Sequence, residues 1–180
     1  MKSVLRSIKP FWLYCTIIRE KTIEVGKTFP KAEDWNREVF FYCSKDRESF
    51  DLIPEKDREW MRKYLGKVAC RFVCDYHTDY TLDDYDNSYF ISDDDLEATC
   101  LLTCELWEYG KGKTLYGWHI SDLVIYDEPR ELSEFQQCHK CKHSCVRTSQ
   151  NVELCKYHRL SRPPQSWCYV EATDPRKTAD

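Results

Sequence analysis

The chain has 180 residues, of which 42% are hydrophobic and 32% charged, and its formal net charge is −4. This length suits one domain with its own core, and the composition is that of a globular protein. No apolar run reaches the ~20 residues of a membrane span, and Arg6, Lys9 and Pro10 interrupt any signal peptide at the start. We therefore expect a cytoplasmic protein without a membrane segment, whose thiols stay reduced.

Charge is distributed unevenly along the chain. Residues 1–31 carry seven Lys or Arg against two Glu, whereas residues 75–108 carry eleven Asp or Glu and no Lys or Arg. Residues 136–162 return to six basic residues against one acidic. The two basic segments could meet on one face while the acidic one points away, or all three could be ordinary solvated surfaces. The overall acidity argues against a nonspecific nucleic-acid coat.

The first half of the chain predicts strands and two helices. Residues 4–9 read as a strand, and Pro10 suits the first turn of a helix. The apolar positions of that helix recur with helical spacing at Phe11, Tyr14, Cys15 and Ile18. Further strands are expected at 21–28 and 38–45, and a helix at 53–66 that starts near Pro54 and ends at Gly66.

The segment 66–76 alternates apolar and polar residues, which is typical of a strand with one buried face. Cys70 and Cys74 share that face with Val68 and Phe72. We therefore expect these two cysteines to be small buried hydrophobic side chains, not metal ligands.

Two short helices and two strands are expected in the second half. Ser92 and Asp95 form a capping box before the first helix, and the acid run around them lacks the spacing and central Gly of a calcium loop. The second helix runs from Thr103, as its cap, to Gly110. A long strand at 115–129 with a bulge near Ser121 and a final strand at 162–170 follow. The order predicts an α+β domain over 1–171, a partly closed β-barrel with short helices on its rim, and a frayed tail at 172–180.

A cysteine-rich insertion at 136–162 has the spacing Cys138-x2-Cys141-x3-Cys145-x9-Cys155. Four thiolates suit tetrahedral Zn²⁺ in a structural site, and His139, His143 or His158 could replace one of them. The segment has few apolar residues, so the metal would have to supply its folding energy. Free thiols in a flexible loop are the alternative. The basic residues around the cluster could contact phosphate or only solubilise the segment.

"SIKPFWLYCTIIREKTIEVGKT" (residues 7–28) resembles the N-terminal signature of ASCH domains, which belong to the PUA-like superfamily. "FFYCSKD", "GKVACRFVCDY", "YGWHISDLVIYDEPRELSEF" and "PPQSWCYV" are similar to later blocks of that family, especially in phages and Firmicute bacteria. The resemblance spans most of residues 3–171. It implies a PUA-like pseudo-barrel with a cleft beside the first helix, in a bacterial or phage-infected cell. It also implies RNA, a nucleotide or a modified nucleoside as ligand.

Two positions depart from the family pattern. Arg19 stands where the family has a Gly before the motif, and Gly26 stands where it has an Arg after the Glu. That Arg would be a candidate for binding phosphate or base. Lys27 is next to Gly26 and could substitute for it, although Lys lacks the bidentate fork of Arg.

The resemblance places Lys9, Trp12, Lys21 and Glu24 at the cleft. Trp12 could stack on a base, and Lys21 with Glu24 could act as acid and base, because one branch of the family hydrolyses N4-acetylcytidine with a Lys, a Thr and a Glu. The alternative is a surface salt bridge between Lys21 and Glu24, with Trp12 in the core.

Trp118 and His119, with Ser166 and Trp167, form a second candidate set. A Trp and a His near one strand end could line the same cleft, and Ser166 could donate a hydrogen bond to a base edge. His119 could be an acid or base, as histidine often is, although a single His on a strand is commonly structural.

Three functions follow from these patterns. The first is a module that binds RNA, a nucleotide or a modified nucleoside and carries a structural zinc clip. The second is a small amidohydrolase acting on an acylated nucleoside. The third is a phage or host protein that acts by binding another protein.

Overall fold

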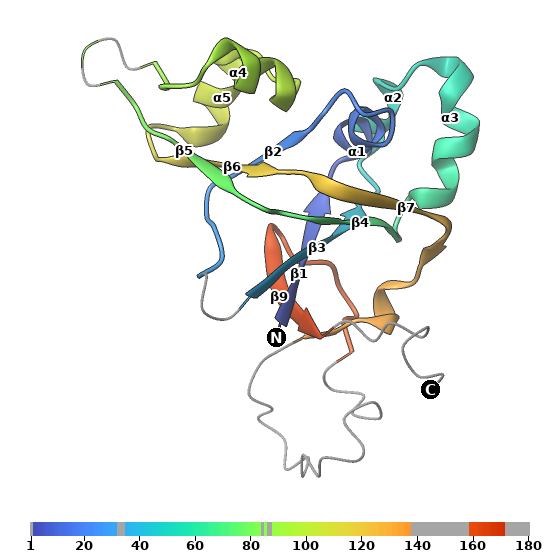
Figure 1. Cartoon of the computed structure of the whole chain (residues 1–180). Coiled ribbons are helices and arrows are strands. Elements are labelled where there is room, and N and C mark those ends of the chain that lie inside the picture. The colour runs from blue at the N-terminus through green and yellow to red at the C-terminus, as the bar shows by residue number, and fades with distance from the viewer. Residues whose placement is uncertain (1, 32–34, 84, 86–87, 138–158, 172–180) are drawn as a thin grey trace.

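The computed structural model describes residues 2–31, 35–83, 85, 88–137 and 159–171. Within these residues the chain forms nine strands in two sheets and five short α-helices (Figure 1). The α+β class expected from the sequence is confirmed. The two sheets meet where the chain passes from the smaller sheet to the larger one, and the helices lie together on one side of them (Figure 1).

The larger sheet has six strands around a parallel pair. Across the sheet they are β7 (Ser121–Arg130), β4 (Val68–Val73), β3 (Trp35–Cys43), β1 (Lys2–Ile8), β9 (Trp167–Glu171) and β8 (Gln136–Gln137). Only β1 and β3 run parallel, whereas the other neighbours are antiparallel. Because β1 is central, residues from its middle are buried on both faces.

The smaller sheet is antiparallel and contains β2 (Ile23–Gly26), β6 (Leu115–His119) and β5 (His77–Tyr80), with β6 in the middle. The single strand predicted at 115–129 is therefore wrong, because the chain leaves β6 at Ile120 and continues as β7 in the other sheet. Asp122 takes a φ of 45° just beyond this break. The phase slip seen near Ser121 marks a change of sheet instead of a bulge within one strand.

The sheets do not close into a barrel, so the predicted partly closed barrel is wrong. β2 pairs with β6 and not with β1. β1 already has β3 and β9 as neighbours in the larger sheet. The Arg6 guanidinium on β1 donates to the Val25 carbonyl oxygen on β2 at 2.6 Å, so a side chain links the two sheets here.

Four of the five described helices begin close to where the sequence places them, whereas α2 was not predicted. They are α1 (Pro10–Ile17), α2 (Arg47–Asp51), α3 (Glu55–Met61), α4 (Asp93–Thr99) and α5 (Thr103–Gly110), with 3₁₀ turns at Arg62–Tyr64 and Leu132–Glu134. Pro10 opens α1, and the Ser92 side chain caps α4, both as predicted. The cap of α5 is Leu102, one residue before the predicted Thr103.

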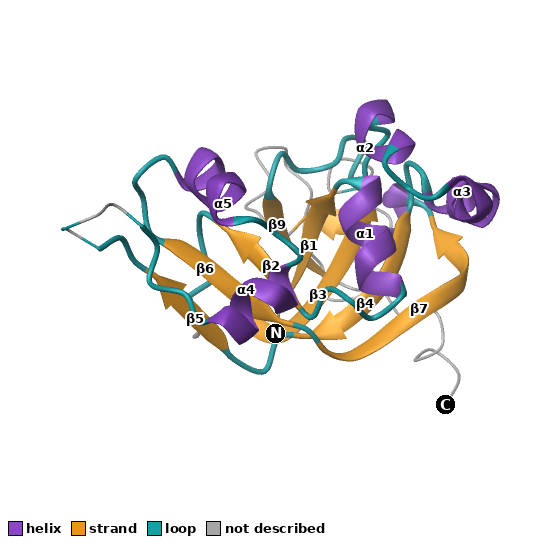
Figure 2. Cartoon of the chain, turned by 90° about the horizontal axis from the view of Figure 1, so that it is seen from above, coloured by secondary structure: helices purple, strands orange, loops and turns teal. Residues whose placement is uncertain are grey.

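Buried side chains of β1, β3 and β4 pack with those of α1, α2 and α3 in the main core. α1 lies across the larger sheet (Figure 2). Cys70 and Cys74 are in this core, at 0% and 1% exposure, which confirms their predicted role as buried hydrophobic side chains. Burial raises the pKa of the Cys74 thiol to about 12, so this thiol stays neutral.

The described residues include no helix long and apolar enough to cross a membrane. The predicted tail at 172–180 and most of the cysteine-rich insertion lie outside the described residues. The residues next to the insertion are described, and Gln136 forms an antiparallel bridge with Arg159. Two described residues on either side of residues 138–158 therefore lie next to each other at the same sheet edge.

Candidate functional site

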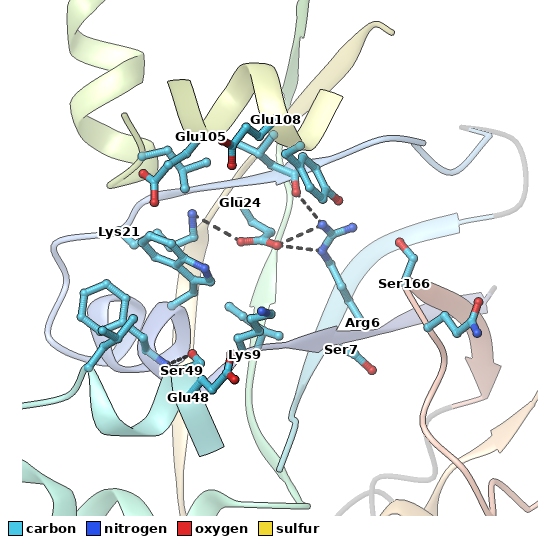
Figure 3. A pocket seen from close by; sticks show the side chains of 18 residues that line it. Arg6, Ser7, Lys9, Lys21, Glu24, Glu48, Ser49, Glu105, Glu108 and Ser166 are labelled. Carbon is cyan, nitrogen blue, oxygen red and sulfur yellow. Dashed lines mark hydrogen bonds and ion pairs between the residues drawn. The ribbon is translucent and has the colours of Figure 1, made fainter. Parts of the chain in front are cut away.

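Two cations and one carboxylate are buried together between β1 and β2. Arg6 comes from the middle of β1, Lys21 from the turn after α1, and Glu24 from β2. Their exposures are 3%, 2% and 8%. The Glu24 Oε1 atom accepts hydrogen bonds from Arg6 Nε at 3.0 Å and Arg6 Nη2 at 2.9 Å (Figure 3). Charged groups are rarely buried this deeply unless they are paired, so this pairing fixes β2 against β1.

The Lys21 ammonium has three acceptors. It donates to the carbonyl oxygens of Ile23 at 2.8 Å and Thr99 at 2.7 Å, and its Nζ lies 3.4 Å from Glu24 Oε2. Thr99 is the last residue of α4, so Lys21 links the α1 turn to that helix and to β2. Because an ammonium has three protons, these contacts use all of its donors.

A cleft of about 730 Å³ opens above this buried cluster (Figure 3). Its walls come from the end of β1, the start of α1, β2, α2, α5 and the segment before β9. The lining residues are Arg6, Ser7, Ile8, Lys9, Phe11, Trp12, Lys21, Glu24, Val25, Glu48, Ser49, Leu52, Leu101, Glu105, Glu108, Tyr109, Gln165 and Ser166. This volume lies within the range of sites for small organic ligands.

The cleft combines aromatic walls with acidic groups. Phe11 and Trp12 line it from α1, and their rings meet edge to face with centroids 4.9 Å apart. Glu48 and Glu108 are exposed at its border, while Glu105 uses one carboxylate oxygen to cap the Leu102 N–H at 2.8 Å. The acidic segment 75–108 therefore contributes to the same cleft as Lys9 and Lys21, instead of pointing away from the basic residues.

Five of the predicted ligand-binding residues line this one cleft: Lys9, Trp12, Lys21, Glu24 and Ser166. Lys9 is exposed and its Nζ lies 3.3 Å from Asp46 Oδ2. Trp12 is half-buried, and the Lys21 Nζ lies 5.6 Å from the centroid of its ring. Ser166 is exposed, and its carbonyl oxygen accepts from the Ser7 N–H at 2.9 Å.

The other three predicted residues do not line this cleft. Lys27 is exposed, and its Nζ lies 4.6 Å from the Tyr109 ring centroid. Trp118 is fully buried in the main core. His119 points to a different surface, where its Nδ1 lies 2.6 Å from Asp75 Oδ1 and its ring stacks on Tyr76 with centroids 4.4 Å apart.

Arg6 is the functional candidate that the sequence reasoning missed. A charged residue in the middle of the apolar run "SVLRSI" was the available signal, because an Arg inside a buried strand needs a partner. Its partner, Glu24, is 18 residues away and on a different sheet. The acidic residues Glu48 and Glu108 were also missed, since their helices carry no motif.

The two departures from the family pattern have structural counterparts. Arg19 has a φ of 67°, a left-handed conformation in which Gly is favoured, and its guanidinium donates to the Leu123 carbonyl oxygen at 3.1 Å. A Cβ atom added at Gly26 would lie 2.9 Å from Arg6 Nη1. The Arg6 guanidinium therefore occupies the space beside Gly26, whereas the Lys27 ammonium lies over the Tyr109 ring.

No protein-family model and no curated protein sequence matches this chain. Solved structures do match. The crystal structure of ASCH from Zymomonas mobilis has a TM-score of 0.52 at 12% identity, over 98% of this chain and 92% of that one. Crystal structures of two single-residue mutants of the same protein give TM-scores of 0.53 and 0.52 at 13% identity, over 98% of this chain and 96% and 93% of theirs.

This chain has the ASCH fold. The family resemblance seen in the sequence is thereby confirmed at the level of the fold. In this ASCH fold, α1 and α5 lie on either side of β2 (Figures 1 and 2). Residues of both helices line the cleft.

The predicted zinc ligands Cys138, Cys141, Cys145 and Cys155 lie outside the described residues. Within the described part, no three His, Cys, Asp or Glu side chains gather as a metal site. The described cysteines are all free thiols. The zinc site therefore remains a prediction from the sequence.

Proposed function

We propose that the cleft binds a nucleobase, as part of RNA, of a nucleotide or of a modified nucleoside. One observation carries the proposal: a nucleotide-sized cleft with aromatic walls opens directly onto a buried polar cluster that includes Arg6. Aromatic faces stack on bases, and polar groups below them can read a base edge. The fold is consistent with this, since ASCH domains are generally linked to RNA binding.

The charges of the cleft favour the base over the phosphate as the group that enters. Glu48 and Glu108 are exposed at the border, and carboxylates there repel phosphate while accepting hydrogen bonds from amino groups. Lys9 is the exposed cation of the cleft lining and is the best placed to meet a phosphate outside it.

The hydrolase alternative has weaker support. A lysine that acts as a base must lose its proton, yet the Lys21 ammonium donates to two carbonyl oxygens and lies beside Glu24. Glu24 in turn accepts two hydrogen bonds from Arg6. Both side chains have the contacts of structural groups, so we favour binding over turnover.

Calorimetry with the four nucleoside monophosphates and a short single-stranded RNA tests the proposal. At least one of them should bind, and Trp12→Ala should weaken that binding about five- to a hundredfold, because stacking on one aromatic contributes ~1–3 kcal/mol. Trp107→Ala is the matched control, since Trp107 is 45% exposed on α5 and does not line this cleft. Absence of binding by every probe at low salt would refute the proposal and favour a protein partner.

We further propose that Cys138, Cys141, Cys145 and Cys155 hold a structural zinc ion. Support comes from their spacing and from the bridge between Gln136 and Arg159, which brings the two ends of the segment together as a metal-clipped loop requires. Protein purified without added zinc should contain close to one zinc ion per chain by elemental analysis, and Cys141→Ser should lose it. Clearly substoichiometric zinc in the wild-type chain would rule the site out.

A further inference from the structure

Two cysteine side chains from distant parts of the chain meet beside Lys21. Cys15 lies in α1 and is 3% exposed, whereas Cys100 follows the last residue of α4 and is half-buried. Their thiols share a hydrogen bond in which Cys15 donates and Cys100 accepts. Cys15 belongs to the main core, and Cys100 packs against that core. Two free thiols in contact are the arrangement from which a disulfide bond can form.

Backbone contacts hold the two thiols together. The Cys15 carbonyl oxygen accepts the Lys21 N–H at 3.0 Å, and the Lys21 ammonium donates to the carbonyl oxygen of Thr99 at 2.7 Å. The Thr22 N–H also donates to the Ala98 carbonyl oxygen at 2.9 Å. The turn after α1 is therefore fastened to the end of α4 next to the thiol pair. Reacting groups held in contact in this way have a high effective concentration.

The backbone at Cys100 is unusual for a residue with a side chain. Cys100 ends α4 with a φ of 56° and a ψ of 26°, and its N–H donates to the Glu97 carbonyl oxygen at 2.9 Å. This left-handed conformation favours Gly at the end of a helix. Backbone preference therefore does not account for a cysteine at this position, whereas its contact with Cys15 does.

The surroundings of the two thiols give them different roles. Burial raises the pKa of the Cys15 thiol to about 12, and burial also raises the pKa of Cys100. The Lys21 ammonium opposes both shifts. Cys100 is the more exposed of the two, so it is the thiol that an oxidant in solution reaches first. Because neither thiol is stabilised as a thiolate by burial, the reduced pair gains little over a disulfide.

We propose that Cys15 and Cys100 are a redox modification site that forms a reversible disulfide with hydrogen peroxide as oxidant. The Cys100 thiolate attacks one peroxide oxygen, and the O–O bond breaks to give a sulfenic acid and, after protonation, water. Cys15 Sγ then attacks Cys100 Sγ, the S–O bond breaks, and the hydroxyl leaves with the Cys15 proton as a second water. The two thiols lose two electrons and the peroxide gains two. A dithiol such as dithiothreitol reverses the modification by thiol–disulfide exchange and is itself oxidised to a disulfide.

The disulfide would tie α1 to the end of α4. α1 carries Phe11 and Trp12 of the cleft wall, and the end of α4 holds the Lys21 ammonium. The modification therefore reaches the cleft through both helices without contacting a ligand. The thiol pair does not depend on the nucleobase proposal, and either can fail alone.

Mass spectrometry of the full chain tests the bond directly. Reduced protein is treated with hydrogen peroxide at pH 8, its free thiols are alkylated after denaturation, and it is digested without reductant. We expect tandem spectra of a peptide pair joined through Cys15 and Cys100, which disappears when dithiothreitol is added before alkylation. Cys104→Ser is the matched control, since Cys104 is exposed on α5, and it should keep the joined pair. Full alkylation of Cys15 after peroxide treatment, or a bond from Cys100 to any other cysteine, would overturn the proposal.

Thermal unfolding tests the same bond in the folded protein. Peroxide treatment should raise the melting temperature of the wild-type protein by about 5–10 °C relative to Cys100→Ser treated in the same way, because a cross-link between distant residues restricts the unfolded chain. Since both proteins receive peroxide, oxidation of the other cysteines affects both alike. Cys100 is half-buried at a helix end, so its replacement leaves the test usable even if Cys15→Ser does not fold. The same change of melting temperature in both proteins would contradict the bond, whereas loss of nucleotide binding alone would count only against the nucleobase proposal.

Discussion

At the scale of single residues, the charged side chains at the floor of the cleft are paired mostly with other groups of the protein. Lys21 was predicted as a cleft residue and does line the cleft, yet it donates to two backbone carbonyl oxygens and approaches Glu24. Lys9 lies in the same cleft but is exposed, with a single ion pair to Asp46. The two lysines therefore have different roles, one in stability and one at the surface.

Lys21→Met should lower the free energy of unfolding by about 3–5 kcal/mol, because it removes the buried ammonium from Glu24 Oε2 and from the carbonyl oxygens of Ile23 and Thr99. Lys9→Met should lower it by less than about 1 kcal/mol, as expected for an exposed pair. Urea unfolding followed by circular dichroism measures both. Equally small changes in the free energy of unfolding of both variants would mean that Lys21 does not stabilise the fold.

Asp46 contributes to the way the free energy of unfolding depends on pH in the acid range. The Ser49 N–H donates to its carboxylate at 2.9 Å and lowers the pKa of Asp46, with Lys9 adding to the effect against the opposing influence of burial. Because the folded pKa is depressed, this stabilisation is present above the unfolded pKa of about 3.9 and is lost as the pH falls through the folded pKa.

Asp46→Asn should therefore show a smaller loss of stability than wild type between pH 5 and pH 2. Asn still caps α2, so the comparison isolates the titrating charge. Urea unfolding at a series of pH values measures the difference. The same loss of stability between pH 5 and pH 2 in wild type and in Asp46→Asn would contradict this role of Asp46.

At the scale of elements, α4 holds the small sheet and the cleft floor together. The Thr22 N–H donates to the Ala98 carbonyl oxygen at 2.9 Å, and Lys21 binds the Thr99 carbonyl oxygen. The Tyr80 hydroxyl donates to Asp95 at 2.9 Å from the other side. Correct formation of this seven-residue helix thus positions Lys21.

Ser92→Ala should destabilise the protein by about 1 kcal/mol, since Ser92 Oγ accepts the Asp95 N–H at 3.1 Å at the start of α4. Ser92→Asp should be close to wild type because Asp caps as well as Ser. Thermal unfolding of the two variants checks this. A loss as large in Ser92→Asp as in Ser92→Ala would show that the cap is not the cause.

Sequence features within a helix or strand predicted most elements correctly. The remaining features depend on pairing between residues that are far apart in the sequence. Pro10 and Ser92 mark helix starts by their own chemistry, and the alternation around Cys70 marks a buried strand. The change of sheet at Ile120 depends on which strand each half pairs with, which periodicity does not encode. The same limit applied to the site, because the pairing of Arg6 with Glu24 joins two sheets across 18 residues.

At the scale of the whole molecule, the charge asymmetry of the sequence is concentrated at the cleft. The basic N-terminal segment supplies Arg6, Lys9 and Lys21, and the acidic segment supplies Glu105 and Glu108 on the opposite wall. A nucleobase bound as we propose would meet the aromatic faces of Phe11 and Trp12 at the side and carboxylates at the border. A base offers a π face to the first and amino groups to the second.

Nuclear magnetic resonance of the six tryptophan indole N–H groups tests the nucleobase proposal most directly. With at least one of AMP, CMP, GMP, UMP or a single-stranded RNA hexamer, the Trp12 signal should shift saturably while the Trp107 signal stays in place. Assignment by Trp12→Phe and Trp107→Phe makes the comparison unambiguous. No shift of Trp12 with any probe at millimolar concentration, or a shift confined to Trp107, would contradict the account.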